Sequence, residues 1–355
     1  MKIGIIRGDG IGPEIVKATQ EVLEATGLLF EWVYIPIGKE GVEKYGHPLS
    51  QESVRMLRDV KVAIKAPLIV DKMEGRLTCK HDDGMEYVYP SLNNAIRREL
   101  GLFINPRPSR GLKGISGRYE NIDLIIMREI TMDVYYGVEY MIGDDIAQCI
   151  KLTTRSGSIN AARYSFEYAR ANGRKKVSCI HKANVMGMTD GMFLRCFREV
   201  AREYPDIESD DYMVDAACYM MAKSPEKFDV LCAPNQYGDI MSDLAAGLVG
   251  SLGLAPGANI GEFASVFEAS HGAAPDIAGK GIVNPAALIL SGALMLRHIG
   301  KIQEGEIVEN AVYEVMSKDG VLTQELGGSA TTAQFSRAVA VKVQKMLQEK
   351  AVNIA

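Results

Sequence analysis

Asp239 and Asp243 are the side chains that most directly indicate chemistry in this sequence. If their segment is helical, both carboxylates leave one face of the helix about one turn apart. A divalent metal with oxygen ligands would satisfy two neighbouring anions and leave positions open for an oxygen-rich substrate. The alternative is structural: Asp239 caps a helix after a turn at Tyr237-Gly238, and Asp243 is a solvated acid in its first turn.

The segment in front of these acids favours the metal site. Residues 228–234 are mostly apolar and predict a buried strand that ends directly before the two aspartates. In open α/β sheets, ligands collect at the carboxyl ends of the strands. The order of strand and acids therefore indicates a site at a sheet edge.

Several basic side chains are also expected at the ends of helices and strands. Arg97, Arg107 and Arg128 are each more often surface residues, but three converging guanidinium groups suit a substrate with several carboxylates. Lys182 follows an expected strand over residues 176–181. A lysine there is commonly a solvent-facing charge, and in a partly desolvated site it can act as an acid or base.

Two glycine-rich segments could approach a ligand closely. Residues 8–14 connect an expected strand to a helix, but no clear acid follows about twenty residues on, so a tight strand-to-helix turn is the alternative to a dinucleotide site. Small residues over 269–281 follow another expected strand and allow close approach to the backbone. Asp276 within them could bind a ribose diol.

Three further segments complete the expected site. Ser91 is expected to cap a helix over residues 91–100, where Asn93 and Arg97 lie one turn apart. Residues 70–90 are irregular and predict a solvated loop or a lid, with Lys72, Arg76, Lys80 and His81 as its cations. Residues 135–140 and 146–153 predict two strands of a hairpin arm.

Composition limits the classes of protein. The 355 residues, 47% of them hydrophobic, can bury a large core split over two domains. The net charge of −5 without a basic run argues against nucleic acid, and no stretch has the roughly 20 apolar residues that span a membrane. The first residues lack the pattern of a signal peptide, and six scattered cysteines form no C-x-x-C pair, so we expect a cytoplasmic protein.

Four segments resemble, in order and spacing, the motifs of the β-decarboxylating dehydrogenases, which comprise isocitrate, homoisocitrate, 3-isopropylmalate and tartrate dehydrogenases. They are residues 8–14, 237–243, 271–276 and 284–285. The resemblance covers nearly the whole chain. It implies an α/β protein with the isopropylmalate-dehydrogenase-like fold and two α/β domains. The first is a discontinuous cofactor-binding domain over residues 1–96 and 250–355, and the second is a central substrate and dimerisation domain over 97–249 with an arm at about 135–153.

The same resemblance implies the reaction and its residues. A 2-hydroxy acid with a C3 carboxylate is oxidised by hydride transfer to NAD and decarboxylated with Mg²⁺ or Mn²⁺, in a homodimer with shared sites. An acid at Asp276 beside Ile277 would repel a 2′-phosphate, which favours NAD over NADP. The implied residues are Asp239, Asp243 and the partner's Asp215 for the metal; Tyr135 and the partner's Lys182 for acid–base catalysis; Arg97, Arg107 and Arg128 for the carboxylates; and Ile11, Glu268, His271, Gly272, Asp276, Ile277 and Asn284 for the cofactor.

The substrate's C3 arm is expected to be anionic, as in isocitrate or homoisocitrate, because Ser91 and Asn93 resemble the isocitrate members of the family. Ile130 and Met132 depart from the usual asparagine and glutamate and are expected to border the site. They leave open a phosphonate analogue or a 3-isopropylmalate- or tartrate-type substrate. A non-catalytic regulatory subunit is the other alternative, against which the full set of catalytic and metal residues argues.

Overall fold

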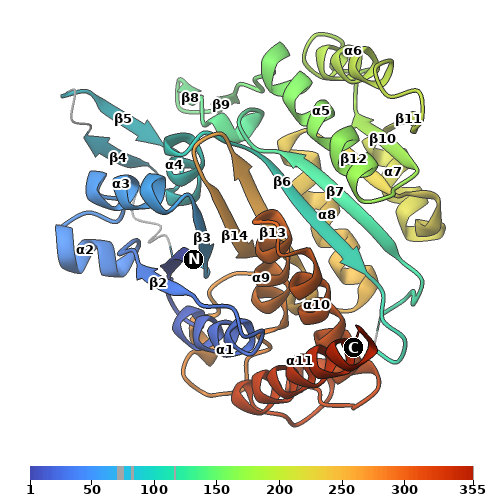
Figure 1. Cartoon of the computed structure of the whole chain (residues 1–355). Coiled ribbons are helices and arrows are strands. Elements are labelled where there is room, and N and C mark those ends of the chain that lie inside the picture. The colour runs from blue at the N-terminus through green and yellow to red at the C-terminus, as the bar shows by residue number, and fades with distance from the viewer. Residues whose placement is uncertain (70–75, 81–83, 116, 355) are drawn as a thin grey trace.

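The computed structural model describes residues 1–69, 76–80, 84–115 and 117–354. Within them, ten strands form one sheet in the order β11-β10-β12-β7-β6-β13-β14-β3-β1-β2 (Figure 1). The strands are β1 Lys2–Ile6, β2 Glu31–Tyr34, β3 Val62–Lys65, β6 Leu102–Arg110, β7 Asp123–Glu129, β10 Lys176–His181, β11 Glu208–Met213, β12 Val230–Ala233, β13 Pro256–Gly261 and β14 Ser265–Ala269. The expected α/β class is confirmed.

The sheet consists of two parallel groups joined by antiparallel strands. β2, β1, β3 and β14 pair in parallel, and so do β7, β12, β10 and β11. β6 and β13 pair antiparallel with each other and with β7 and β14, respectively. The two expected domains, residues 1–96 with 250–355 and residues 97–249, meet in the sheet at the ladder between β6 and β13. Because hydrogen bonds continue across it, the division into two domains stays a prediction.

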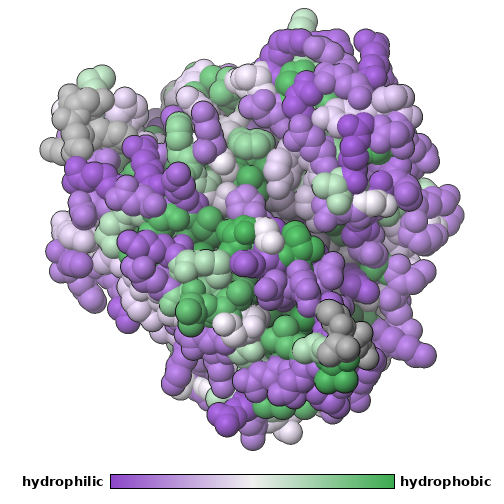
Figure 2. Space-filling model, viewed as in Figure 1, coloured by the Kyte–Doolittle hydropathy of each residue, from purple (hydrophilic) through white to green (hydrophobic). Residues whose placement is uncertain are grey.

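Helices cover both faces of this sheet. They are α1 Gly12–Glu24, α2 Lys39–Tyr45, α3 Gln51–Val60, α4 Leu92–Glu99, α5 Arg155–Ala171, α6 Thr189–Ala201, α7 Val214–Lys223, α8 Asn235–Val249, α9 Ala286–His298, α10 Ile302–Ser317 and α11 Thr332–Ile354. On one face, α1, α5, α6, α9, α10 and α11 share a single large core. Figure 1 shows α9, α10 and α11 gathered beside α1, and Figure 2, in the same view, shows polar residues over most of this side with hydrophobic ones gathered near its middle.

The other face carries two separate cores. α3 and α4 pack over one half of the sheet, and α7 and α8 pack over the other half. Side chains alternate along each strand, so Phe267 of β14 enters the large core while Val266 enters the core below α3 and α4. Glu268, two residues after Val266 in β14, therefore points to the same face of the sheet as Val266. Polar side chains at such positions collect between the two cores.

Two expectations about elements are wrong. Asp239 is not a helix cap, because α8 begins at Asn235 and Asp239 lies one turn inside it. Arg107 is not at an element end, because β6 runs from Leu102 to Arg110 in spite of Pro106 and Pro108. The strand tolerates both prolines because the ladder between β6 and β13 ends at Ile104. The N–H groups that Pro106 and Pro108 lack therefore interrupt no pairing with β13.

The segment over residues 70–90 is also not wholly irregular. β4 (Leu77–Lys80) and β5 (Glu86–Tyr89) form an antiparallel hairpin, and Cys79 and Tyr89 are buried beneath it. The charged residues concealed this alternation in the sequence. Of the expected lid cations, Lys72 and His81 lie outside the described residues. Arg76 is exposed, and its guanidinium donates to the backbone oxygen of Glu139 at 3.4 Å.

The expected hairpin arm is confirmed as β8 (Glu139–Ile142) and β9 (Ile146–Cys149), an antiparallel pair whose residues are all exposed. Tyr135 precedes it in a short 3-10 turn, η1 (Val134–Tyr136), rather than in the first strand. In the described part of the chain, no helix has both the length and the apolar character required for a membrane span.

Candidate active site

Asp239 is the centre of a cluster formed by α8, β6 and β7. Its Oδ1 accepts hydrogen bonds from Arg107 Nη1 at 3.2 Å and from Arg128 Nη1, and its Oδ2 accepts from Tyr135 Oη at 2.5 Å. Gly238 allows this approach, because a Cβ there would lie 2.7 Å from the side chain of Arg128. Helix α8 thus presses directly onto β7 and brings the aspartate to both arginines.

The charges in this cluster are well defined. Burial alone would raise the pKa of Asp239, but Arg128 and Arg107 outweigh it and hold that pKa below its ordinary value. Burial and the hydrogen bond to Asp239 raise the pKa of Tyr135 to about 12. Burial and the neighbouring Arg107 lower the pKa of Arg128 to about 9. At neutral pH the site therefore holds an ionised carboxylate, a protonated phenol and cationic guanidinium groups.

A cavity of about 290 Å³ opens beside this cluster. All five expected substrate residues, three of the expected cofactor residues, the expected acid and one metal ligand line it. Those are Ser91, Asn93, Arg97, Arg107, Arg128, Tyr135, Asp239, Glu268, His271 and Gly272. Ser91 caps α4, where its oxygen accepts from Asn94 N–H at 3.2 Å, and buried Oδ1 of Asn93 has no partner among the described residues. The start of α4 therefore presents polar groups at one end of the cavity.

The second metal acid and the two residues expected to serve the partner's site do not line this cavity. Asp243 lies one turn beyond Asp239 on α8, and its Oδ1 is 4.0 Å from Arg107 Nη1. Burial raises the pKa of Asp243. Lys182 and Asp215 pair with each other at 2.6 Å, on the segment after β10 and the first turn of α7. Two acids on α8 fit a hard divalent cation, but within the described residues no third acid, histidine or cysteine joins them.

The two glycine-rich segments lie against each other. The N–H of Ile11 donates to Ala273 O at 2.9 Å, and Gly10 has a positive φ of 58°. A Cβ at Gly10 would lie 2.1 Å from that same carbonyl oxygen. Glycine is therefore required for this contact, which joins the strand-to-helix turn to the segment that contains His271.

Unsatisfied polar atoms in these segments fit a bound cofactor. Nε2 of His271 and Nδ2 of Asn284 are buried and have no hydrogen-bond partner among the residues described. Buried polar atoms without partners are uncommon in proteins. Asp276 is exposed beside half-buried Ile277 in the turn η4 (Pro275–Ile277), so its carboxylate is accessible to a ribose.

The sequence interpretation missed a polar network that crosses the sheet beneath the cavity. Asn105 Oδ1 accepts from Arg107 Nε at 2.5 Å, and Asn105 Nδ2 donates to Asn259 Oδ1 at 3.0 Å. Asn259 Nδ2 in turn donates to Glu268 at 2.6 Å, and Lys65 Nζ lies 2.5 Å from the same carboxylate. Alternation of polar and apolar residues in a central strand is the signal that could have revealed it.

Glu268 is tied into this network. Burial would raise its pKa, but Lys65 and Arg97 lower that pKa to about 2. Its carboxylate therefore stays ionised and already has partners, and its contact with the cofactor remains a prediction. Ile130 and Met132, expected to border the site, are both buried and do not line the cavity.

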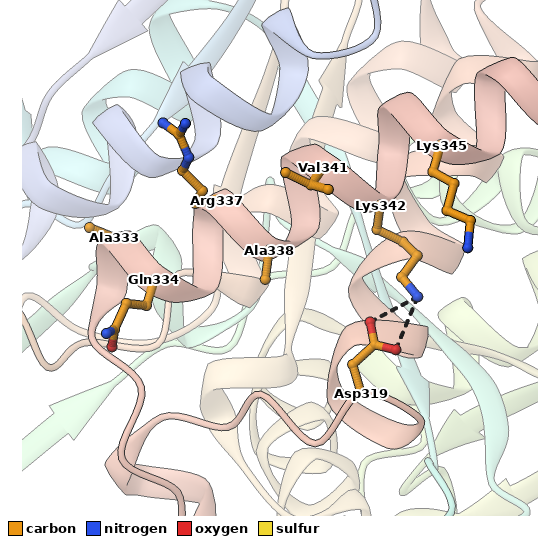
Figure 3. A pocket seen from close by; sticks show the side chains of 8 residues that line it. All are labelled: Asp319, Ala333, Gln334, Arg337, Ala338, Val341, Lys342 and Lys345. Atoms are coloured by element: carbon orange, nitrogen blue, oxygen red, sulfur yellow. Dashed lines mark hydrogen bonds and ion pairs between the residues drawn. The ribbon is translucent and has the colours of Figure 1, made fainter.

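A larger hollow of about 650 Å³ lies along α11 (Figure 3). Figure 3 shows Lys342 directed at Asp319, and these two groups form an ion pair at 2.8 Å. None of the residues expected to do chemistry lines this hollow. The smaller cavity with the arginines is thus the candidate active site.

The fold and this site define an oxidoreductase of the decarboxylating dehydrogenase class. The chain belongs to the isocitrate/isopropylmalate dehydrogenase family, because the sequence model of that family matches residues 2–339. The resemblance found in the sequence is confirmed.

Relatives named isopropylmalate dehydrogenase and relatives named isocitrate dehydrogenase are both similar to this chain over nearly its full length. The 3-isopropylmalate dehydrogenase of Archaeoglobus fulgidus is 44% identical, with 96% of this chain and 98% of that protein covered. A relative in Arabidopsis thaliana, isocitrate dehydrogenase [NAD] catalytic subunit 5, mitochondrial, is 43% identical, with 94% and 86% covered. The crystal structure of isocitrate dehydrogenase from Methylococcus capsulatus superposes with a TM-score of 0.89 at 43% identity, covering 97% of this chain and 99% of that one.

Proposed function

We propose that the protein catalyses the NAD- and divalent-metal-dependent oxidative decarboxylation of a 2-hydroxy acid with a C3 carboxylate and an anionic C3 arm. The substrate class is isocitrate-like or homoisocitrate-like. The observation that carries the proposal is the cavity, in which three arginines and the polar start of α4 surround the Tyr135–Asp239 pair. Several cations in so small a space suit a substrate with several carboxylates.

Each part of the cavity has a separate task. Arg107 and Arg128 bind the carboxylates beside the reacting carbon, and they already hold Asp239 ionised. Ser91 and Asn93 receive the C3 arm, because the amino end of a helix favours an anion and both side chains can donate hydrogen bonds. Arg97 is buried and lines the same cavity, so it supplies a third guanidinium group for a carboxylate.

Tyr135 is the proton donor of the proposed reaction. Its raised pKa keeps the phenol protonated at neutral pH, and its hydroxyl already points at the carboxylate of Asp239. A group of this kind can return a proton to the carbon from which CO₂ has left. A bound divalent metal supplies Lewis acidity at the substrate's oxygens, and bound NAD accepts the hydride.

Asp239 and Asp243 would hold the metal, and the segments at 8–12 and 271–284 would hold the cofactor. The adenosine-side residues are Ile11, His271, Asp276, Ile277 and Asn284, and the exposed acid at Asp276 disfavours a 2′-phosphate. Two of these side chains offer the buried polar atoms without partners. The acid at Asp276 is the group that favours NAD over NADP.

A homodimer with shared sites completes the constellation. Lys182 and Asp215 form their own pair away from the cavity, as expected of residues that serve a second site. The arm of β8 and β9 exposes apolar side chains, including Tyr140, Met141 and Ile146, which suit pairing with another subunit. We place Lys182 as the base, and Asp215 as a metal ligand, in the site of the partner subunit.

Coupled assays test the reaction. With isocitrate, NAD and Mg²⁺, NADH and CO₂ should appear in equal amounts, and excess EDTA should stop both until Mg²⁺ or Mn²⁺ is restored. Asp239→Asn should lose the activity and keep the fold. Full activity after dialysis against EDTA would contradict the metal's role, and NADH without CO₂ would contradict the decarboxylation.

A further inference from the structure

A buried ion cluster lies outside the cavity at the base of the arm. Nζ of Lys151 lies 3.0 Å from Asp133 Oδ1 and 3.3 Å from Asp190 Oδ1, and it stands 4.5 Å above the ring of Tyr237. Asp133 is 2% exposed and Asp190 is fully buried. A single ammonium group thus holds two carboxylates that come from different parts of the chain.

The first carboxylate controls the tyrosine side of the site. Asp133 Oδ1 accepts from Val134 N–H at 2.8 Å, and its Oδ2 accepts from Gln236 N–H at 3.0 Å. Val134 begins the 3-10 turn that carries Tyr135, and Gln236 lies in the first turn of α8, which carries Asp239. One side chain therefore fixes the two backbone segments that bring the phenol and the carboxylate together.

The second carboxylate controls the lysine. Asp190 Oδ2 accepts from the backbone N–H of Lys182 at 2.7 Å, and Asp190 lies in the first turn of α6. This hydrogen bond fixes the segment between β10 and α6 at Lys182, the residue that we assign to the partner's site. Nζ of Lys182 itself points away from the cluster, to Asp215 at 2.6 Å.

We infer that Lys151 is a positioning residue that serves two active sites at once. The inference rests on the proposed function and its shared sites. In the dimer, the Asp133 branch orients Tyr135 and Asp239 in the chain's own site, whereas the Asp190 branch orients the Lys182 that this chain presents to its partner's site. Removal of the ammonium leaves two buried carboxylates that repel each other, so both branches lose their position.

The cofactor segments provide an internal reference. None of the hydrogen bonds and ion pairs that the described residues make with Lys151, Asp133 and Asp190 involves residues 8–12 or 271–284, and these two segments approach each other through Ile11 and Ala273. Lys151→Met, which keeps the length of the side chain, should therefore lower kcat by about tenfold to a hundredfold, the range caused by misplacement of catalytic groups. The KM for NAD should stay within about twofold.

Lys176→Met is a matched control. Lys176 is also largely buried, at 18% side-chain exposure, and lies 2.6 Å from Asp210, 3.7 Å from Glu208 and 6.0 Å from the ring of Tyr212. It has two carboxylates and a tyrosine ring, like Lys151, but lies at the first residue of β10, the end of that strand opposite to Lys182. Its replacement should leave kcat within about twofold. An equal fall in kcat for both variants would contradict a specific role of Lys151.

Hybrid dimers separate the two branches. The reference hybrid pairs Lys182→Met with Asp239→Asn, so both homodimers are inactive and one hybrid site is intact. Adding Lys151→Met to the Lys182→Met chain perturbs only the tyrosine half of that site. Adding it to the Asp239→Asn chain perturbs only the lysine half. We expect each addition to lower the hybrid's kcat by about threefold or more.

Each outcome of the hybrid experiment has a definite meaning. A fall in both hybrids supports the inference, and a fall in one or neither overturns it while the shared site stands. An inactive reference hybrid, despite proven subunit exchange, overturns the shared-site proposal and this inference with it. If Lys151→Met chains do not fold, Asp190→Asn replaces them and should lower only the hybrid whose lysine half carries it; an effect on the tyrosine half instead overturns the inference.

Discussion

At the scale of single residues, burial and neighbouring charges set the protonation states, and two glutamates behave in opposite ways. Glu129 is buried beside backbone N–H donors, yet burial outweighs those bonds and raises its pKa from 4.5 to about 7. Glu268 is also buried, but Lys65 and Arg97 lower its pKa to about 2. A buried acid with a cation thus stays ionised, whereas one without a cation takes up a proton.

This contrast predicts a pH-dependent stability. The pKa of Glu129 is higher in the folded than in the unfolded protein. Its contribution to the free energy of unfolding is therefore fully present below pH 4.5 and is lost as the pH rises through 7. The free energy of unfolding should fall by about 2 to 3 kcal/mol between pH 5 and 8 on this account. Urea unfolding of Glu129→Gln should show that this part of the decrease is gone. Glu268→Gln is the control and should keep it, since that group titrates below this range.

The cofactor preference that we propose also depends on single side chains. Asp276 is exposed beside Ile277 in η4, so a 2′-phosphate would meet a carboxylate there. Asp276→Lys with Ile277→Tyr should shift the preference from NAD towards NADP, since each such contact is worth on the order of 1–3 kcal/mol. The ratio of kcat/KM for the two cofactors measures the shift. Equal values for NAD and NADP in the unaltered enzyme would reject the assignment.

At the scale of elements, the order of strands and helices could be predicted but their ends could not. Apolar runs such as residues 228–234 and the hairpin arm follow from the periodicity of the sequence, and the structure confirms both. β6 was missed because two prolines usually exclude a central strand, and only the ladder to β13 shows why they are tolerated. The hairpin β4–β5 was missed because charged residues hide its buried positions.

The candidate site shows the same limit. Residues at the ends of elements, such as Arg128 and Ser91, could be identified from their neighbours in sequence. Lys151 meets acids from a turn and a helix, and Asn105 and Asn259 meet across 154 residues of the chain. A single sequence does not give such pairings, because they arise only when the sheet assembles.

Helix α4 provides a prediction at this scale. Ser91 both caps the helix and lines the cavity, so Ser91→Leu should cost about 1 kcal/mol of stability and also place an apolar side chain against the substrate's anionic arm. The kcat/KM for isocitrate should fall far more than that for malate. Ser50 caps α3 in the same way, so Ser50→Leu should lose only the stability. Parallel losses with both substrates in Ser91→Leu would show that the serine acts only as a cap.

At the scale of the whole molecule, one sheet carries both halves of the machinery. β14 and β3 bring the segment that contains His271, and Lys65, to the cavity, while β6, β7 and α8 bring Arg107, Arg128 and Asp239. The site therefore lies between two separate cores on one face, where the polar network joins them. Lys182 and Asp215 remain outside the cavity in the single chain, which is why we propose that a second subunit completes it.

We propose that the cavity selects a 2-hydroxy acid with an anionic C3 arm. The most direct test is kcat/KM from the rate of NADH formation with Mg²⁺, compared between isocitrate or homoisocitrate and 3-isopropylmalate or malate. We predict that the substrates with a carboxylate-bearing arm exceed the other two by about tenfold or more, because the hydroxyl of Ser91 and the amide of Asn93 line the cavity and can donate hydrogen bonds to a carboxylate. A higher kcat/KM for 3-isopropylmalate or malate would contradict the anionic arm.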